Sequence, residues 1–179
     1  MAIEVQAPNS FTRYIGAPQY ITMFAGGSIE MNAASLWQKR LIAAFRDYNE
    51  VVILNPRRDA WDSSWNRTKN SKNFRQQVKW ERFGLEECDL AFMYFDPATK
   101  SPISLYELGR YGRREDDFNI PKMHVICPPG FWRKGNVDIA CEDDNIPMYP
   151  SLGAAIKFVK ANLDKYRHGP SQVSKGILR

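Results

Sequence analysis

Hydrophobic and polar residues form short blocks along the chain, and the spacing within each block predicts its secondary structure. Compact apolar runs that are rich in β-branched and aromatic residues are typical of buried strands. Five such runs predict strands at residues 20–24, 51–54, 89–95, 122–127 and 137–141. Gly26-Gly27 and Asn55-Pro56 follow the first two runs, as expected where a strand ends in a turn.

Segments between these runs carry apolar residues three and four positions apart, which is the spacing of one helix face. They predict helices over residues 30–48, from Asn73 to about Glu87, and in the segment that contains Glu107. A last helix is expected after Ser151, which suits an N-cap. Because strands and helices alternate, we expect a flavodoxin-like, doubly wound α/β fold, with a five-stranded parallel sheet and helices on both faces.

The chain of 179 residues is long enough for one domain with a sizeable core. Residues 1–18 contain prolines and small polar residues without a clear period, so we expect an extended N-terminal arm. Residues 19–167 are expected to form the single domain, and residues 168–179 a flexible tail. Residues 57–72 are polar and carry Trp61 and Trp65, which indicates a long loop of a kind that is often functional.

Composition and charge exclude several classes of function. The net charge is +5, but the basic residues form scattered pairs, without the basic stripe and interleaved aromatic residues of a nucleic-acid-binding face. No apolar run approaches roughly 18 residues, the length needed for a membrane span. The N-terminus does not resemble a secretory signal. We therefore expect a cytoplasmic protein that binds neither a membrane nor a nucleic acid polymer.

Cysteine and histidine are too few and too scattered to suggest catalysis or metal binding. Cys88, Cys127 and Cys141 show no metal-ligand spacing and are expected to be reduced core residues. His124 lies in a predicted strand and is expected in the core, while His168 lies in the tail. We expect no metal and no cofactor. Carboxylates remain as the catalytic groups, which favours glycosyl chemistry over acyl transfer or metal-dependent hydrolysis.

Glu107 is the first catalytic candidate. It follows the predicted strand 89–95, and ligands of open α/β sheets bind at the carboxyl ends of strands. We expect Glu107 in the first turn of a helix, where the helix dipole and unpaired backbone N–H groups favour an ionised carboxylate. Such a group can attack a sugar carbon or stabilise a cationic sugar. The alternative is that Glu107 is only a charge at a helix start.

Loops that follow parallel strands meet at one edge of the sheet, so they supply the other candidates. The glycine-rich segment Ala25–Ser28 either offers backbone N–H groups to a phosphate or sugar hydroxyl or forms a plain tight turn. Trp61 and Trp65 either stack on a base or anchor their loop. The candidate ligands of a sugar or phosphate are Asn55, Arg57 and Asn136.

Several motifs, in order along residues 20–141, resemble the nucleoside 2-deoxyribosyltransferase-like family. The last of them contains Glu107, and another contains Glu81, which lies in the middle of the predicted helix before the third strand. The motifs are Phe24-Ala25-Gly26-Gly27, Leu54-Asn55-Pro56-Arg57-Arg58, Gln77-Val78-Lys79-Trp80-Glu81, Cys88-Asp89 and Pro102-Ile103-Ser104-Leu105-Tyr106-Glu107-Leu108-Gly109. The segment Phe131–Val137 extends the likeness.

This resemblance implies the fold expected above and an enzyme of nucleoside salvage that exchanges the base of a 2'-deoxynucleoside. It implies that Glu107 is the nucleophile and that Glu81 contributes to the site, which it reaches only if its helix begins beside the edge of the sheet. The ligands would be a nucleoside or nucleotide and a free nucleobase. The resemblance also implies a homo-oligomer, a dimer or higher, in which a neighbouring subunit helps to close the pocket.

The chain departs from the classical transferases at two positions. It has Phe24 close to where they carry a tyrosine, and Ser101 where they carry an aspartate. Candidate replacements for that aspartate are Asp59, Asp62 and Asp96. The predicted substrate-binding residues are Asn55, Arg57 and Asn136, named above, together with Phe24, Gly26, Gly27, Asp59, Trp61, Asp96 and Ser101.

Three functions remain open from the sequence. The first is transfer of the sugar between bases through a covalent intermediate on Glu107, with Glu81 or an aspartate protonating the departing base. The second is hydrolysis of a (deoxy)nucleoside 5'-monophosphate, with Arg57-Arg58 or Arg133 binding the phosphate. The third is a non-catalytic module that senses a nucleotide.

Overall fold

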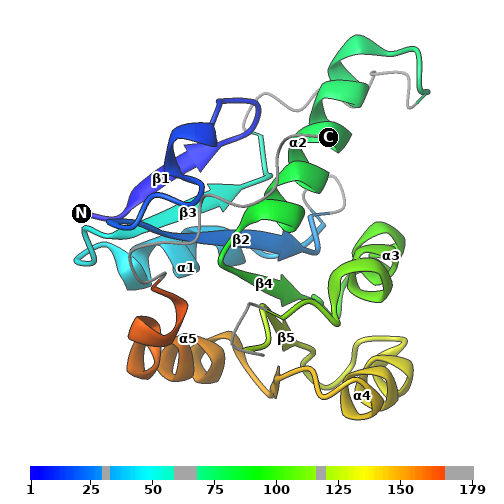
Figure 1. Ribbon diagram of the computed structural model, residues 1–179. Coiled ribbons are helices and arrows are strands. Elements are labelled where there is room, and N and C mark those ends of the chain that lie inside the picture. Colours follow the sequence, from blue (N-terminus) through cyan, green and yellow to red (C-terminus); the bar gives the residue numbers. More distant parts are fainter. Residues whose placement is uncertain (30–32, 59–67, 116–119, 168–179) are drawn as a thin grey trace, which may run out of the picture.

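A six-stranded parallel sheet forms the centre of the protein (Figure 1). The computed structural model describes residues 1–29, 33–58, 68–115 and 120–167. The strands lie in the order β1-β3-β2-β4-β5-β6, and each neighbouring pair is parallel. Their bounds are Ile3–Gln6 (β1), Ile21–Gly27 (β2), Val51–Asn55 (β3), Leu90–Tyr94 (β4), Met123–Ile126 (β5) and Met148–Tyr149 (β6).

The strand order contains the point at which a doubly wound sheet reverses direction. From β2 the chain passes to β3 on one side, and later to β4 on the other side of β2. Without β1, this is the order of flavodoxin-like sheets, which confirms the predicted fold class, although the sheet has six strands and not the predicted five. Ligands of such sheets bind where the order reverses, outside the carboxyl ends of the strands. In this chain the carboxyl ends of β2 and β4 flank that point, with Gly27 paired with Tyr94.

Helices cover both faces of the sheet, as predicted (Figure 1). Helices α1 and α5 pack on one face, through Trp37, Leu41 and Val159 among others. Helices α2, α3 and α4 pack on the opposite face with the 3-10 helix η1. The bounds are Thr12–Tyr14 (η1), Trp37–Phe45 (α1), Lys72–Glu87 (α2), Pro102–Tyr111 (α3), Lys134–Asp143 (α4) and Leu152–Ala161 (α5), followed by the 3-10 helix η3 (Leu163–Tyr166).

Two predicted segments differ from the structure. Residues 1–18 are more than an extended arm, because β1 pairs with β3 at the edge of the sheet and η1 follows it. The predicted fifth strand, residues 137–141, lies inside α4. Val137 and Cys141 are the buried residues of this helix and lie four positions apart, which is the spacing of one helix face. The sheet is instead completed by β6, whose two residues are too few to produce a pattern.

Several smaller predictions are confirmed. The Oγ atom of Ser151 accepts a hydrogen bond from the backbone N–H of Ala154 at 3.2 Å, so Ser151 caps α5. His124 is a core residue, with its Nδ1 3.0 Å from the Tyr149 hydroxyl and its Nε2 2.7 Å from the Tyr166 hydroxyl. Burial lowers the pKa of His124 to about 4. The cysteines are buried and form no disulfide.

The described part of the chain contains neither a cluster of metal-ligating side chains nor a membrane-spanning helix. No group of three or more histidine, cysteine, aspartate or glutamate side chains there is arranged to hold a metal ion. None of the helices in those residues combines the length and apolar character that crossing a membrane requires.

Two glycines allow close packing around β2: Gly27 packs against β4, and Gly84 lets α2 approach β2. Gly27 has φ +129°, and a Cβ atom there would lie 2.2 Å from the carbonyl oxygen of Tyr94. Gly84 lets α2 approach β2, since a Cβ atom there would lie 2.6 Å from the ring of Phe24. The first contact involves backbone, which cannot move aside without disturbing the pairing of β2 with β4.

Replacing Gly27 by Ala is therefore expected to destabilise the protein by about 3 kcal/mol or more, because strain and a backbone clash add. This corresponds to a fall in Tm of about 6–12 °C, measurable by thermal unfolding. Gly135→Ala in α4 is the matched control, since open space surrounds its Cβ position and alanine favours a helix. A Gly27→Ala protein that melts with the control would contradict the packing described here.

Candidate active site

A cavity of about 680 Å³ lies beside the end of β2 and is walled by α2 and α3. The arrowheads of β2 and β4 in Figure 1 point toward α3. Phe24, Gly26 and Gly27 contribute from β2, and Pro56, Arg57 and Arg58 from the loop after β3. Apolar side chains such as Phe74, Val78 and Ile103 make up much of the wall. This is the expected place for a ligand in a sheet of this order.

Two carboxyl groups, one from each helix, line this cavity. Glu81 lies in the middle of α2, and it reaches the cavity because the first turns of α2 extend past the sheet (Figure 1). Glu107 comes from α3. Since α3 begins at Pro102, Glu107 lies in its second turn, and the prediction that it occupies the first turn is wrong. The structure thus brings together both residues that were predicted to be catalytic.

The electrostatics of the pair also differ from the prediction. Burial raises the pKa of Glu107 to about 8, and the nearby negative charge of Glu81 contributes to this rise. Burial raises the pKa of Glu81 to about 7, against the opposing effects of a hydrogen bond from Gln77 and the charge of Arg58. Glu107 is therefore not held ionised by a helix terminus. Near neutral pH the two carboxyl groups retain about one proton between them.

Gln77 is a further site residue, for which no role was predicted from the sequence. Its Nε2 atom donates hydrogen bonds to Glu81 Oε1 and to the backbone oxygen of Pro56, both at 2.8 Å. The side chain is buried and lines the cavity. The four-residue spacing from Gln77 to Glu81, which places both on one helix face, was the signal available in the sequence.

Ser101 lines the cavity at the start of α3, in the left-handed region with φ 46°. Its hydroxyl lies 2.6 Å from that of Ser28 and 2.8 Å from that of Thr99, and all three residues are buried. The Ser28 hydroxyl also accepts a hydrogen bond from the backbone N–H of Asp96 at 2.8 Å. This hydroxyl cluster joins the ends of β2 and β4 to α3, and so holds the helix that carries Glu107.

Three predicted site residues lie outside the lining of this cavity. Asp96 is occupied elsewhere, since its carboxylate accepts hydrogen bonds from Ser35 N–H (2.9 Å), Ser35 Oγ (2.7 Å) and Ala98 N–H (3.0 Å). Burial acts to raise the pKa of Asp96, but these bonds outweigh it and lower the pKa. Asn55 donates to Glu4 Oε1 at 2.7 Å, and Asn136 is exposed on α4.

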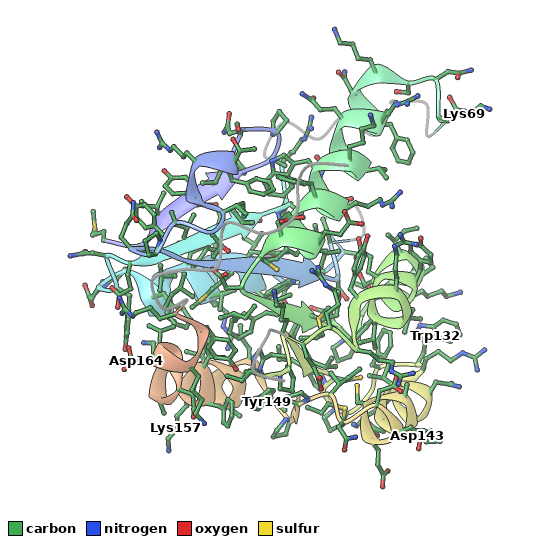
Figure 2. All side chains as sticks on the ribbon, in the orientation of Figure 1. Lys69, Trp132, Asp143, Tyr149, Lys157 and Asp164 are labelled. Atoms are coloured by element: carbon green, nitrogen blue, oxygen red, sulfur yellow. The ribbon has the colours of Figure 1, made fainter. Side chains whose placement is uncertain are left out.

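Of the remaining candidates, four lie outside the described residues, and the fifth, Arg133, is described but does not line the cavity. Asp59, Asp62, Trp61 and Trp65 lie outside the described residues. Arg133, a candidate for binding phosphate, stacks on the ring of Trp132 at 4.4 Å. Figure 2 shows Trp132 near α3 and α4, and its Nε1 donates to the backbone oxygen of Lys100 at 2.9 Å. Neither side chain belongs to the lining of the cavity between α2 and α3.

A second, polar cavity of about 320 Å³ adjoins the first, because Arg57 and Arg58 line both. Glu4, Gln38 and Lys39 are among its other lining residues. The Nη1 atom of Arg57 donates to the backbone oxygen of Ser35 at 3.1 Å. Three cationic side chains and one carboxylate therefore surround this space, an excess of positive charge that suits an anionic group.

The raised pKa values predict how stability depends on pH. A carboxyl group with a higher pKa in the folded state binds more protons than in the unfolded state, so stability falls as pH rises from about 4.5 to about 8. Glu107→Gln removes this penalty, and at pH 9 it is expected to stabilise the protein by roughly 3 kcal/mol, which corresponds to about 6–12 °C in Tm. At pH 4 the two proteins are expected to melt together.

The exposed residue Glu87, on the last turn of α2, supplies the control. Glu87→Gln is expected to leave Tm unchanged across the same range of pH. Equal Tm values for wild type and Glu107→Gln at pH 9 would contradict the proposed penalty for ionising the buried pair.

Comparison with known proteins adds one positive finding. The model of a family described as nucleoside 2-deoxyribosyltransferase like matches residues 20–131. The matched segment begins just before β2, ends after β5, and contains both Glu81 and Glu107. A comparison with curated proteins gave no match.

Proposed function

Because the chain belongs to the nucleoside 2-deoxyribosyltransferase-like family, we propose that it cleaves the N-glycosidic bond of a (deoxy)nucleoside and transfers the sugar to another base. The observation that supports this most directly is the pair of half-buried carboxyl groups, Glu81 and Glu107, in one largely apolar cavity. Retaining glycosyl chemistry requires two carboxyl groups at the scissile bond, one as nucleophile and one as acid.

In the proposed mechanism, the Glu107 carboxylate attacks the anomeric carbon. The bond between that carbon and the base nitrogen breaks, its electron pair stays with the base, and the base takes a proton from Glu81. A glycosyl ester on Glu107 results. The second base then attacks the same carbon, the ester bond breaks, and the proton of the attacking nitrogen returns to Glu81. A pKa of about 7 suits Glu81 to both steps near neutral pH.

The surroundings of the pair are suited to transfer rather than loss of the sugar to water. Apolar side chains, including Phe24 and Ile103, line much of the cavity. An apolar wall strengthens electrostatic interactions with a developing sugar cation and limits the access of water to a covalent intermediate. Gly26 and Gly27, at the end of β2 beside β4, line the same cavity.

A second function is favoured by the adjoining polar cavity. Arg57, Arg58 and Lys39 are grouped there beside the cavity that holds the carboxyl pair. Guanidinium groups bind phosphate through paired hydrogen bonds. A nucleoside 5'-monophosphate is therefore the alternative substrate, with water in place of the second base as the acceptor.

Identification of the reaction products distinguishes sugar transfer from hydrolysis. The protein is incubated with deoxynucleosides, ribonucleosides and their 5'-monophosphates, with and without a free acceptor base. Base exchange without net hydrolysis supports transfer, and free sugar phosphate supports hydrolysis. Binding without product under every condition contradicts both and favours a nucleotide-sensing module. The predicted homo-oligomer and cytoplasmic location stay predictions.

A further inference from the structure

The buried amide of Gln77 has a defined orientation. Its Nε2 atom donates one hydrogen bond to the backbone oxygen of Pro56 and another to Glu81 Oε1, both at 2.8 Å. The oxygen of Pro56 can only accept a hydrogen bond. Rotating the amide by 180° would place its oxygen against that carbonyl and lose both bonds. The loop after β3 therefore keeps the NH₂ group of Gln77 directed at Glu81.

The fixed N–H donor of Gln77 stabilises the ionised form of the Glu81 carboxyl group more than its neutral form. Hydrogen bonds to a carboxylate are stronger than those to a neutral carboxyl, so an N–H aimed at Oε1 favours ionised Glu81. Gln77 and Glu81 lie one turn apart on α2, where their relative position changes little. Gln77 is buried and the bond is partly buried, which strengthens it relative to a bond in water.

The charged groups that face the cavity from the surrounding elements also affect the ionisation of Glu81. Arg57 and Arg58 face the cavity from the loop after β3, Glu107 faces it from α3, and the lining residues of β2 carry no charge. The charge of Arg58 lowers the pKa of Glu81. For Glu107, burial and the charge of Glu81 both raise the pKa. The repulsion between the two carboxylates is mutual, so it does not select one of them, but ionised Glu81 has two stabilising partners, Gln77 and Arg58.

We infer that Gln77 is a positioning residue that holds Glu81 ionised and thereby assigns the proton of the carboxyl pair to Glu107. This deepens the proposed function and rests on it for its catalytic consequence. The nucleophile of the ligand-free protein is kept as a neutral acid. The proton passes from Glu107 to Glu81 when substrate is bound, and from Glu81 to the base as the N-glycosidic bond breaks, so that no further proton donor is needed.

The test is a titration that requires no turnover. The carboxyl carbons of ¹³C-labelled glutamate are followed by NMR against pH, with Glu107→Gln and Glu81→Gln used to assign the two signals. In wild type, Glu107 is expected to titrate at about pH 8 and Glu81 at about pH 7. In Gln77→Met, which keeps the length of the side chain without the donor, Glu81 is expected to titrate higher and Glu107 lower, each by about half to one pH unit.

A double mutant distinguishes positioning from general disturbance of the fold. If Gln77 acts through Glu81, adding Gln77→Met to Glu81→Gln leaves the titration of Glu107 unchanged. An equal shift of Glu107 in both backgrounds would overturn the inference, as would an unchanged Glu107 in the single variant. A protein with no enzymatic product but with these titrations would contradict the proposed function alone.

Wild type offers a measurement that does not depend on the folding of any variant. The side-chain NH₂ protons of Gln77 are expected to exchange slowly with solvent and to change chemical shift near pH 7, as Glu81 titrates. Side-chain protons that exchange rapidly and do not respond to pH would contradict the fixed donor.

Discussion

Replacing Glu107 by Gln is expected to reduce turnover by about 10⁴-fold or more, the largest effect among the changes considered. An amide of the same size fits the space of the carboxyl group but cannot form the glycosyl ester. Because the variant also loses the penalty of a buried charge, it is expected to fold and to bind a nucleoside in the cavity. A loss of activity with a stability that is equal or higher distinguishes a catalytic group from a structural one.

The measurement is a single-turnover assay of base release, together with ligand binding by calorimetry. Glu87→Gln, an isosteric change of an exposed carboxyl group on α2, is expected to keep full activity. A Glu107→Gln protein that retains more than about a tenth of the wild-type rate would show that another group attacks the sugar.

Replacing Glu81 by Gln is expected to reduce turnover less, by about 10²–10⁴-fold, which is the usual contribution of general acid catalysis. It is also expected to change the pH profile. In wild type the singly protonated pair is the productive form, so activity is expected to be highest between about pH 7 and pH 8. Without the charge of Glu81 the pKa of Glu107 falls. Because the variant has no second carboxyl group whose proton can be lost, the basic limb of the profile is expected to disappear.

The leaving group provides a check on the role of Glu81. A 7-methylated purine deoxynucleoside carries a positive charge on its base, which departs without needing a proton. Glu81→Gln is therefore expected to lose far less activity with this substrate than with an ordinary purine deoxynucleoside. Equal losses with both substrates would assign Glu81 to binding rather than to proton transfer.

Much of the fold could be predicted from the sequence because the central strands are buried on both faces. Residues 51–54 of β3, for example, form an uninterrupted apolar run between helices with one apolar face. The hydrophobic pattern did not predict the secondary structure correctly where an element has few apolar residues or is short. Val137 and Cys141 suit either a strand or one face of a helix, and only the packing of α4 decides between them. Strands β1 and β6, with four and two residues, pair at the edges of the sheet without a distinctive sequence.

The site was predictable in its positions but not in its electrostatics. Glu107 and Glu81 could be placed because a motif and its spacing locate them on neighbouring helices. Their raised pKa values depend on burial and on the approach of two helices that are distant in sequence. Asp96 shows the reverse case, since its position after β4 suggested a ligand contact, but Ser35 and the N–H of Ala98 use its carboxylate to hold the loop.

The most direct test of the covalent mechanism is mass spectrometry of the protein after brief incubation with deoxynucleosides and deoxynucleotides. The mechanism predicts a gain in mass of one sugar residue, located on the peptide of α3 that contains Glu107, and its loss when an acceptor base is added. Two results would contradict the mechanism. One is product formation with an adduct on another residue. The other is product formation with no adduct in rapidly quenched samples, together with an active Glu107→Gln variant.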